Sequence, residues 1–339
     1  MTETIKRNPS FVSAQKVAQR AGVSRSAVSR TFTDGASVSE ETRRKVMQAA
    51  DELGYHVNHL ARGLINHRSN IICIVAADMA APWQSRMLEV VSRRLQDDDK
   101  VTMVINTSGN NASVARALGQ TINYRADATV VLSGTPAASL IDTCIANGQH
   151  VILINRDDHP DGPDNLRMDY AAAAQEAFFM LQRAGCERMA VISSQSETPS
   201  IRGREQAFAD VAGAAGVEVI VTRAGATLYQ TGVEAARQLF ARADPPDGAF
   251  CVTDLLACGF MDSARHEFGV SVPDDLCVVG HDDIEQAGWQ SYNLTTFRQP
   301  LEQIAEEICL LLSRQSRSLH PEVLTFQPQP IWRKSVRPR

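Results

Sequence analysis

The feature that most constrains the fold is a series of continuous apolar runs that begins at residue 71 and alternates with amphipathic stretches. Apolar runs of this kind, without a polar residue at every second position, are typical of parallel strands covered by helices on both faces. Repetition of strand and helix predicts an α/β fold with open parallel sheets, and its extent favours two lobes over one sheet. The predicted strands are Ile71–Ala77, Val101–Ile105, Ala128–Leu132, Val151–Ile154, Met189–Ile192, Val217–Val221, Ala249–Val252 and Leu276–Val279.

Residues 13–54 follow a different pattern, which predicts three short helices. A serine that can cap a helix precedes each of them, and a glycine can end the first and the third. Two helices joined by a tight turn that contains glycine, followed by a third helix, predict a helix-turn-helix. The capping residues are Ser13, Ser24 and Ser39, and the terminating glycines are Gly22 and Gly54.

The net charge of −5 conceals an asymmetry along the chain. The first 68 residues hold eleven Lys and Arg against six Asp and Glu, a net charge of +5, which leaves −10 for the remainder. A small basic head on a large acidic body predicts that only the head binds a polyanion.

Composition excludes several classes of protein. Hydrophobic residues make up 44% and charged residues 22%, as in globular proteins, and no apolar run is long enough to span a membrane. Residues 1–10 are polar and lack the apolar stretch of a secretory signal, so we expect a cytoplasmic protein without membrane contact. The seven cysteines are scattered singly, without a CxxC pair, and we expect them to be reduced core residues.

Two segments of the head carry a resemblance to a known family. SAQKVAQRAGVSRSAVSRTF, followed by VSEETRRKVMQAADELGYHVNHLARGL, resembles the DNA-binding head of LacI/GalR-type bacterial repressors. The body agrees with that family in order, through ERMAVIS, IRGREQAF, CVTDLLACGFMDSARHEFGVSVPDDLCVVGHDDI, LTTFRQP and IWRKSV. The resemblance covers essentially residues 11–336.

The resemblance implies three parts of the chain. They are an all-α helix-turn-helix head, a hinge helix with its linker, and an α/β effector-binding and dimerisation body. The body would consist of two doubly wound parallel-sheet lobes, similar to periplasmic sugar-binding proteins, with the effector between them. The implied boundaries are 1–57 for the head, 58–69 for the hinge and 70–339 for the body. Within the body, the N-lobe is about 70–168 plus 299–326, and the C-lobe about 169–298 plus 327–339.

The family pattern also implies a set of DNA-binding residues. The second helix would enter the major groove, where Arg25, Ser26 and Arg30 read base edges and Ser24 and Ser29 contact phosphates. In the hinge, Leu64 stands where family members insert a leucine into the minor groove, and an apolar wedge of this kind kinks the duplex. The alternatives are a solvated arginine face and an ordinary linker. The expected hinge contacts are Asn58, Ala61 and Leu64.

Five residues of the body are candidates for effector binding. Asp282 in GHDDI and Arg204 in IRGREQAF match the acid and the arginine that hold the effector in the family. Asn155 and Asp254 follow predicted strands, and ligands of open α/β sheets bind at strand ends. Trp83 follows Pro82 in the loop after the first strand. The alternatives are helix capping for Asp254 or Asp282 and a core position for Trp83.

The chain departs from the family pattern around this pocket. Thr253 replaces an Asn that often precedes the Asp, and Thr227 stands where an aromatic ring commonly stacks on the ligand. The identity of the effector therefore cannot be carried over from the family. The candidates are a sugar, a sugar acid and a sugar phosphate. An acidic effector is a hypothesis that rests on three arginines, which are Arg156, Arg202 and Arg204.

These observations predict a transcriptional regulator, acting as a homodimer on a palindromic operator and controlled by a small molecule. We expect no cofactor and no metal, since His56 and His59 lack further ligands at suitable spacing. An enzyme is disfavoured because GxGxxG after the first strand, a phosphate-binding loop and GxSxG are all missing. The alternatives left open are a sugar-binding carrier, against which the basic head argues, and a sugar-processing enzyme.

Overall fold

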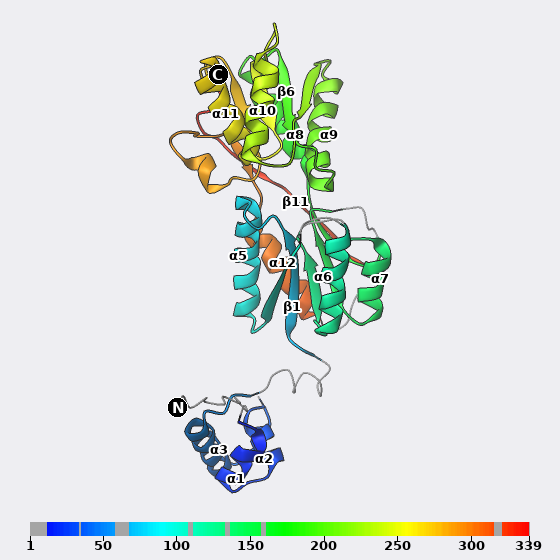
Figure 1. Cartoon of the computed structure of the whole chain (residues 1–339), viewed down its shortest axis with the longest axis vertical. Coiled ribbons are helices and arrows are strands. Elements are labelled where there is room, and N and C mark those ends of the chain that lie inside the picture. Colours follow the sequence, from blue (N-terminus) through cyan, green and yellow to red (C-terminus); the bar gives the residue numbers. More distant parts are fainter. Residues whose placement is uncertain are drawn as a thin grey trace, which may run out of the picture. The chain divides into compact units, whose positions relative to one another are not determined.

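The computed structural model of the chain describes residues 12–33, 35–57, 68–107, 111–132, 136–156, 161–314 and 321–338. The chain divides into two compact units, residues 1–69 and residues 70–339, called here the head and the body (Figure 1). The predicted hinge contacts Asn58, Ala61 and Leu64 lie outside the described residues. None of the described helices is both long and apolar enough to cross a bilayer.

The head consists of three helices around a small apolar core. A serine side chain accepts a backbone N–H at the start of each helix, and glycines with positive φ end the first and the third. Val17, Val28 and Val46 come from different helices and are fully buried against one another. The predicted helix-turn-helix is thus confirmed. Its helices are α1 (Ala14–Ala21), α2 (Arg25–Thr31) and α3 (Glu40–Leu53).

The N-lobe of the body is built on a six-stranded sheet with the strand order β11-β5-β4-β3-β1-β2. All neighbouring strands in it are parallel, as the apolar runs predict. Its strands are β1 (Ile71–Ala77), β2 (Val101–Thr107), β3 (Ala128–Val131), β4 (His150–Ile154), β5 (Asp164–Met168) and β11 (Val323–Phe326). Its helices are α5 (Pro82–Asp97), α6 (Asn111–Asn123), α7 (Ala138–Ala146) and α12 (Leu301–Ser313).

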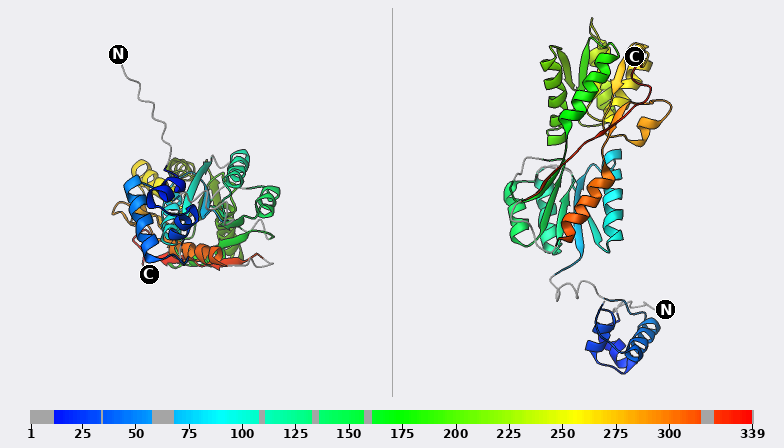
Figure 2. Two further views of the ribbon diagram at one scale, coloured as in Figure 1. Left: turned by 90° about the horizontal axis from the view of Figure 1, so that it is seen from below. Right: turned by 180° about the vertical axis from the view of Figure 1, so that it is seen from behind.

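Both faces of the N-lobe sheet are buried along its inner strands β1, β3 and β4. Side chains alternate along a strand, so Ile72 and Ile74 pack with α5 and α12 on one face. Val75 packs on the other face, with α6 and α7. Figure 2 shows α12 lying along one face of this sheet. The double cover explains why the apolar run of β1 has no polar alternation.

The C-lobe is built on a four-stranded parallel sheet with the order β7-β6-β8-β9. Phe208 and Phe250 stack within its core, with ring centroids 4.8 Å apart. Its strands are β6 (Met189–Ser193), β7 (Val219–Arg223), β8 (Gly248–Cys251) and β9 (Cys277–Val279). Its helices are α8 (Tyr170–Arg183), α9 (Pro199–Ala214), α10 (Tyr229–Phe240), α11 (Asp254–Phe268) and the short 3-10 helix η1 (Glu285–Gly288).

Four strands were not among those predicted. They are β5, β11 and an antiparallel pair, β10 (Thr296–Arg298) and β12 (Gln329–Ile331). The sequence of β5 is DNLRM, which lacks the continuous apolar character of the other strands. These strands lie near the places where the chain passes from one lobe to the other, after Met168, after Gln299 and after Phe326.

Candidate functional site

The exposed face of α2 gathers the predicted DNA-binding residues of the head. Arg25, Ser26, Ser29 and Arg30 are all exposed, whereas Val28 on the opposite side is fully buried. At 100° per residue the four exposed positions fall within one arc of about 140°. The helix therefore presents both arginines and two hydroxyls to solvent on one side.

Ser24 is the N-cap residue of this helix. Its Oγ accepts the backbone N–H of Ala27 at 3.1 Å and lies 2.8 Å from the Oγ of Ser26. Ser24 is itself exposed, so the hydroxyl caps α2 while it faces solvent. The cap fixes the N-terminal turn that carries Arg25.

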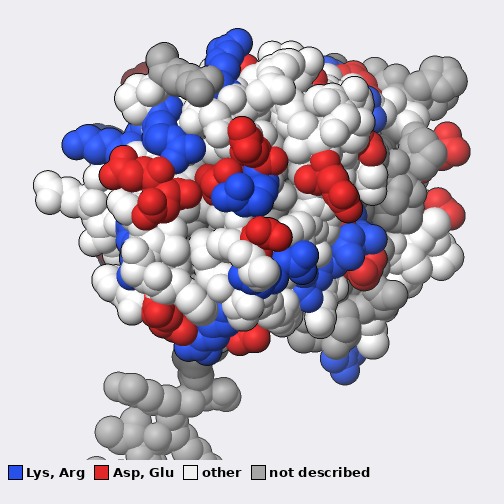
Figure 3. Space-filling model, turned by 90° about the horizontal axis from the view of Figure 1, so that it is seen from above, with Lys and Arg blue, Asp and Glu red and all other residues white. Residues whose placement is uncertain are grey.

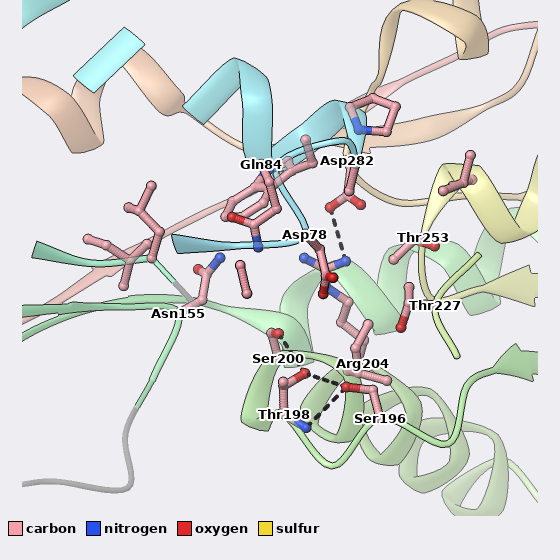
Figure 4. Close-up of a pocket in the computed structure, with 18 of the residues that line it drawn as sticks. Asp78, Gln84, Asn155, Ser196, Thr198, Ser200, Arg204, Thr227, Thr253 and Asp282 are labelled. Atoms are coloured by element: carbon pink, nitrogen blue, oxygen red, sulfur yellow. Dashed lines mark hydrogen bonds and ion pairs between the residues drawn. The ribbon is translucent and has the colours of Figure 1, made fainter. Parts of the chain in front are cut away.

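A cavity of about 330 Å³ lies between the two lobes of the body. Its walls come from the carboxyl ends of strands and from the first turns of α5, α9 and α11, which is where open α/β sheets bind ligands. Four of the five predicted effector residues line it, and Figure 4 shows Asn155, Arg204 and Asp282 facing its interior. The four are Trp83, Asn155, Arg204 and Asp282.

Arg204 and Asp282 form an ion pair in the wall of the cavity. The Arg204 Nη1 atom lies 3.0 Å from Asp282 Oδ1 and donates to the carbonyl oxygen of Val252 at 2.7 Å. The guanidinium also lies over the ring of Tyr170, with 5.5 Å from its carbon to the ring centroid. Both charged side chains are less than a tenth exposed. The positive charge of Arg204 is therefore already balanced in this structure.

Gln299 links this ion pair to the N-lobe. Its Nε2 donates to Asp282 Oδ1 at 2.8 Å, and its Oε1 accepts from Asn155 Nδ2 at 3.3 Å. Gln299 is buried and follows β10, at one of the passages between the lobes. A continuous hydrogen-bonded chain thus runs from Arg204 through Asp282 and Gln299 to Asn155. Gln299 was not among the predicted site residues, and its partner Asn155 is 144 residues away along the chain.

Asp254 was predicted to contact the effector, but it does not line this cavity. Its carboxyl group is fully buried and accepts the N–H of Ile284 at 2.9 Å and the hydroxyl of Thr296 at 2.5 Å. Helix capping does not describe it either, because Thr253 is the capping residue of α11. Asp254 instead fixes the loop between β9 and η1, which carries Asp282.

Burial sets the protonation of two groups behind the cavity. Burial, with a smaller contribution from the charge of Asp282, raises the pKa of Asp254 to about 7. Burial and the Arg204 charge lower the pKa of His281 to about 4, against the opposing effect of Asp282. His281 therefore lies neutral between the rings of Tyr170 and Phe297. No sequence signal pointed to His281 as part of this site.

Among the described residues, several polar atoms at the cavity are buried without a hydrogen-bond partner. Two of them are donors, Trp83 Nε1 and Arg204 Nε. The other two are acceptors, Gln84 Oε1 and Asn155 Oδ1. A buried polar atom without a partner is costly. All four atoms belong to residues that line the cavity, and each is left without a partner in this arrangement of the lobes.

Further polar residues line the cavity that the sequence analysis did not propose as ligands. They include Asp78, Gln84 and a hydroxyl group cluster at the start of α9, all visible in Figure 4. Asp78 directly follows the predicted strand Ile71–Ala77, so the strand-end rule could have found it. The cluster at α9 consists of Ser196, Thr198 and Ser200.

Two family descriptions match the chain. Residues 14–58 match "Bacterial regulatory proteins, lacI family", and residues 179–336 match "Periplasmic binding protein-like domain". The chain is 27% identical over 329 residues to the HTH-type transcriptional repressor PurR of Photobacterium profundum, which covers 95% of this chain and 97% of that protein. It is 26% identical over 319 residues to the HTH-type transcriptional repressor CytR of Escherichia coli, which covers 93% of each.

Solved structures agree in fold. The lac repressor dimer bound to operator and the anti-inducer ONPF aligns with a TM-score of 0.86 at 21% identity, over 96% of this chain and 99% of that one. The complex of the transcriptional regulator CelR with cellobiose aligns with a TM-score of 0.70 at 24% identity, with the same coverage.

Fold and site together define a class of protein: a helix-turn-helix DNA-binding head joined to a two-lobed body of the periplasmic-binding-protein type. Within that class, residues 14–58 match the lacI family of bacterial regulatory proteins, as the sequence motifs of the head predict, and the two relatives named above are transcriptional repressors. The chain is a DNA-binding transcriptional regulator with an effector-binding body.

Proposed function

We propose that the chain represses transcription in the cytoplasm, as a homodimer on a palindromic operator, and that it acts by binding and not by catalysis. Support for the DNA contact comes from the exposed face of α2, where Arg25 and Arg30 lie beside two serines. The body offers a contrast, because acidic and basic side chains are interspersed across the face seen in Figure 3. Two-fold symmetric operators are typical of dimeric helix-turn-helix proteins.

The effector is a neutral, hydroxyl-rich small molecule with an apolar face. The observation that carries this proposal is the balanced charge of the cavity, where Asp78 and Asp282 offset Arg156 and Arg204. Unpaired donors and acceptors lie beside apolar walls that include the indole of Trp83. A volume of about 330 Å³ is at the small end of the range of roughly 300–1,000 Å³ for small-molecule sites.

The earlier hypothesis of an acidic effector finds less support in these contacts. Arg202 does not line the cavity and instead lies 3.2 Å from Glu205 and 3.7 Å from Glu197. Arg204 already has Asp282 as its counter-ion. An acidic ligand would have to compete with that carboxylate for the guanidinium, whereas a hydroxyl group can accept from Arg204 Nε and donate to Asp282.

Calorimetry on the full chain tests the class of effector. Neutral sugars would be compared with the matching sugar acids and sugar phosphates at one pH and salt concentration. We expect binding by a neutral member and weaker binding by its acidic counterparts. Tight binding of an acid or a phosphate, without binding of the neutral parent, would show that the effector class is wrong.

The hydrogen-bonded chain from Arg204 to Asn155 joins the two lobes, so an effector that binds to it interacts with both of them. A ligand changes DNA affinity only to the extent that it binds one lobe arrangement better than another. Arg204→Ala and Asp282→Ala should therefore abolish the ligand's effect on operator binding. Arg202→Ala is the matched control, because it removes a neighbouring charge on the same helix without touching the cavity. A normal response in Arg204→Ala would mean that the effector binds elsewhere.

A further inference from the structure

Two of the seven buried cysteines lie close together at the edge of the C-lobe sheet opposite the cavity. Cys277 is the first residue of β9, and Cys186 lies between α8 and β6. Between them is Gly248, which pairs in register with Cys277. A Cβ atom placed on Gly248 would lie 2.8 Å from Cys186 Cβ and 3.0 Å from its Sγ. The absence of a side chain at Gly248 leaves room for Cys186 beside Cys277. The Cys186 thiol donates to the carbonyl oxygen of Asp247 at 3.3 Å.

Arg337 covers this pair of thiols. Its backbone N–H lies 3.5 Å from Cys277 Sγ, and its Nη2 lies 3.7 Å from Cys186 Sγ. The same guanidinium donates to the carbonyl oxygens of Ala184 and Pro273, each at 3.1 Å. These anchors hold a positive charge and a backbone donor against the sulfurs, which is the kind of surrounding that stabilises a thiolate.

The two thiols differ in acidity. The neighbouring thiol of Cys186, with the N–H and the charge of Arg337, lowers the pKa of Cys277 to about 7, against the opposing effect of burial. The neighbouring thiol of Cys277, together with burial, raises the pKa of Cys186. Thiolate is the nucleophile in disulfide chemistry, so Cys277 is suited to attack and Cys186 to resolve the product.

Another pair of cysteines in the C-lobe provides a contrast. Cys251 ends β8 and Cys258 lies on α11, both buried. Burial and the neighbouring Asp254 raise the pKa of both thiols. A thiol with a raised pKa stays protonated near neutral pH, and the protonated thiol is a poor nucleophile.

We propose that Cys186 and Cys277 are a redox-active pair that closes to a disulfide on reaction with a hydroperoxide. The Cys277 thiolate attacks one peroxide oxygen; an S–O bond forms, the O–O bond breaks, and the departing oxygen takes up a proton. Cys186 then attacks the sulfenic sulfur, forming the S–S bond, and the hydroxyl group leaves as water with the proton of Cys186. With hydrogen peroxide, two thiols lose two electrons and two protons, and the peroxide becomes two molecules of water.

Peptide mapping of the full chain tests this proposal. The protein is treated with hydrogen peroxide at neutral pH, denatured in N-ethylmaleimide and digested for mass spectrometry. We expect a linked pair of peptides that contain Cys186 and Cys277, with N-ethylmaleimide on the other five cysteines. Addition of dithiothreitol before labelling should restore all seven thiols. The measurement uses the unaltered chain, so it does not depend on the folding of any variant.

Two variants separate the proposed pair from the other cysteines. Cys186→Ser should lose the disulfide and leave Cys277 as a sulfenic acid that dimedone labels. Cys258→Ser is the matched control, and it should form the 186–277 disulfide at the parent's rate. The proposal is overturned if all seven thiols oxidise at similar rates, if a different pair is linked, or if both thiols persist while added glutathione is oxidised.

Discussion

The head and the body are stabilised in different ways. The core of the head is built from small side chains, Val17, Val28 and Val46 with three alanines, and serine caps start its helices. The body buries both faces of its sheets and stacks large rings such as Phe208 on Phe250. Local interactions therefore contribute a larger share of the stability in the head, whereas contacts between distant residues dominate in the body.

The largest effect that would test this contrast is expected at the crossing of α10 and α11. A Cβ atom on Gly259 would lie 2.0 Å from the carbonyl oxygen of Tyr229, so Gly259→Ala must separate the two helices. We expect a loss at or above the upper end of about 1–3 kcal/mol in the free energy of unfolding of the body, with the head unchanged. Urea denaturation of the full chain, monitored with a spectroscopic probe in each unit, measures the free energy of unfolding of the body and of the head.

Gly213→Ala is the control for that glycine. Gly213 lies on α9, its φ is not positive, and a Cβ atom there would meet nothing within 4 Å. Its substitution should leave the stability unchanged or raise it by up to about 1 kcal/mol. Equal losses in both variants would contradict the close crossing of α10 and α11.

A second effect concerns the pH dependence of the body. The pKa of Asp254 is raised to about 7 in the folded chain, so folding favours the protonated carboxyl group. Its contribution to stability is fully present below the ordinary carboxyl pKa of about 4 and is lost as the pH rises through 7. Asp254→Asn mimics the protonated form and should remove this dependence, whose slope is at most about 1.4 kcal/mol per pH unit.

The measurement is the difference in unfolding free energy between Asp254→Asn and the parent at pH 4 to 8. His281 contributes in the opposite sense, because its lowered pKa makes the fold less stable as the pH falls below about 6.5. That contribution is common to both proteins and cancels in the difference. A difference that stays constant with pH would mean that Asp254 is ionised in the folded chain throughout.

A third effect tests the exposed face of the head. Arg25→Ala should weaken operator binding by about 1–3 kcal/mol and relax the preference for a G·C pair at one position of each half-site. Arg44→Ala, an exposed arginine on α3, removes the same charge away from α2 and should leave the sequence preference intact. Binding would be measured on a set of operator variants at one salt concentration. An equal loss of affinity for all operator variants would show that Arg25 contacts a phosphate and not a base.

The smallest effect is expected at a helix cap of the head. The Ser39 Oγ accepts the backbone N–H of Thr42 at 3.3 Å, so Ser39→Ala should lower the stability of the head by about 1 kcal/mol. Thermal unfolding followed by a probe in the head measures it, with the exposed Ser37→Ala as control. A cost equal to that of the control would show that caps do not stabilise the head as the contrast requires.

The same contrast decides how much the sequence could predict. The caps Ser13, Ser24 and Ser39 act within a few residues, so the helices of the head were predictable. The apolar strands were predictable from their continuous apolar runs. Strand β5 was missed because its burial depends on neighbours and not on an apolar run.

Within the site, the sequence indicated residues that line the cavity where position along the chain determined the geometry. Strand ends bring Asn155 and Asp282 to the cavity, and both line it. The orientation of Asp254 depends on Ile284 and Thr296, which are 30 and 42 residues away, so the sequence could not show that it faces away. The link through Gln299 was hidden for the same reason.

The place of β11 in the sheet has a consequence for synthesis on the ribosome. The head needs only the first part of the chain and can fold as soon as α3 has emerged. The N-lobe must wait, because its sheet is completed by Val323–Phe326 and its core by α12, both translated after the long C-lobe segment that holds β6 to β9. Until then the edge of β5 and the part of one sheet face that packs on α12 are uncovered. A nascent chain of this protein should therefore engage chaperones through its N-lobe long after its DNA-binding domain is complete.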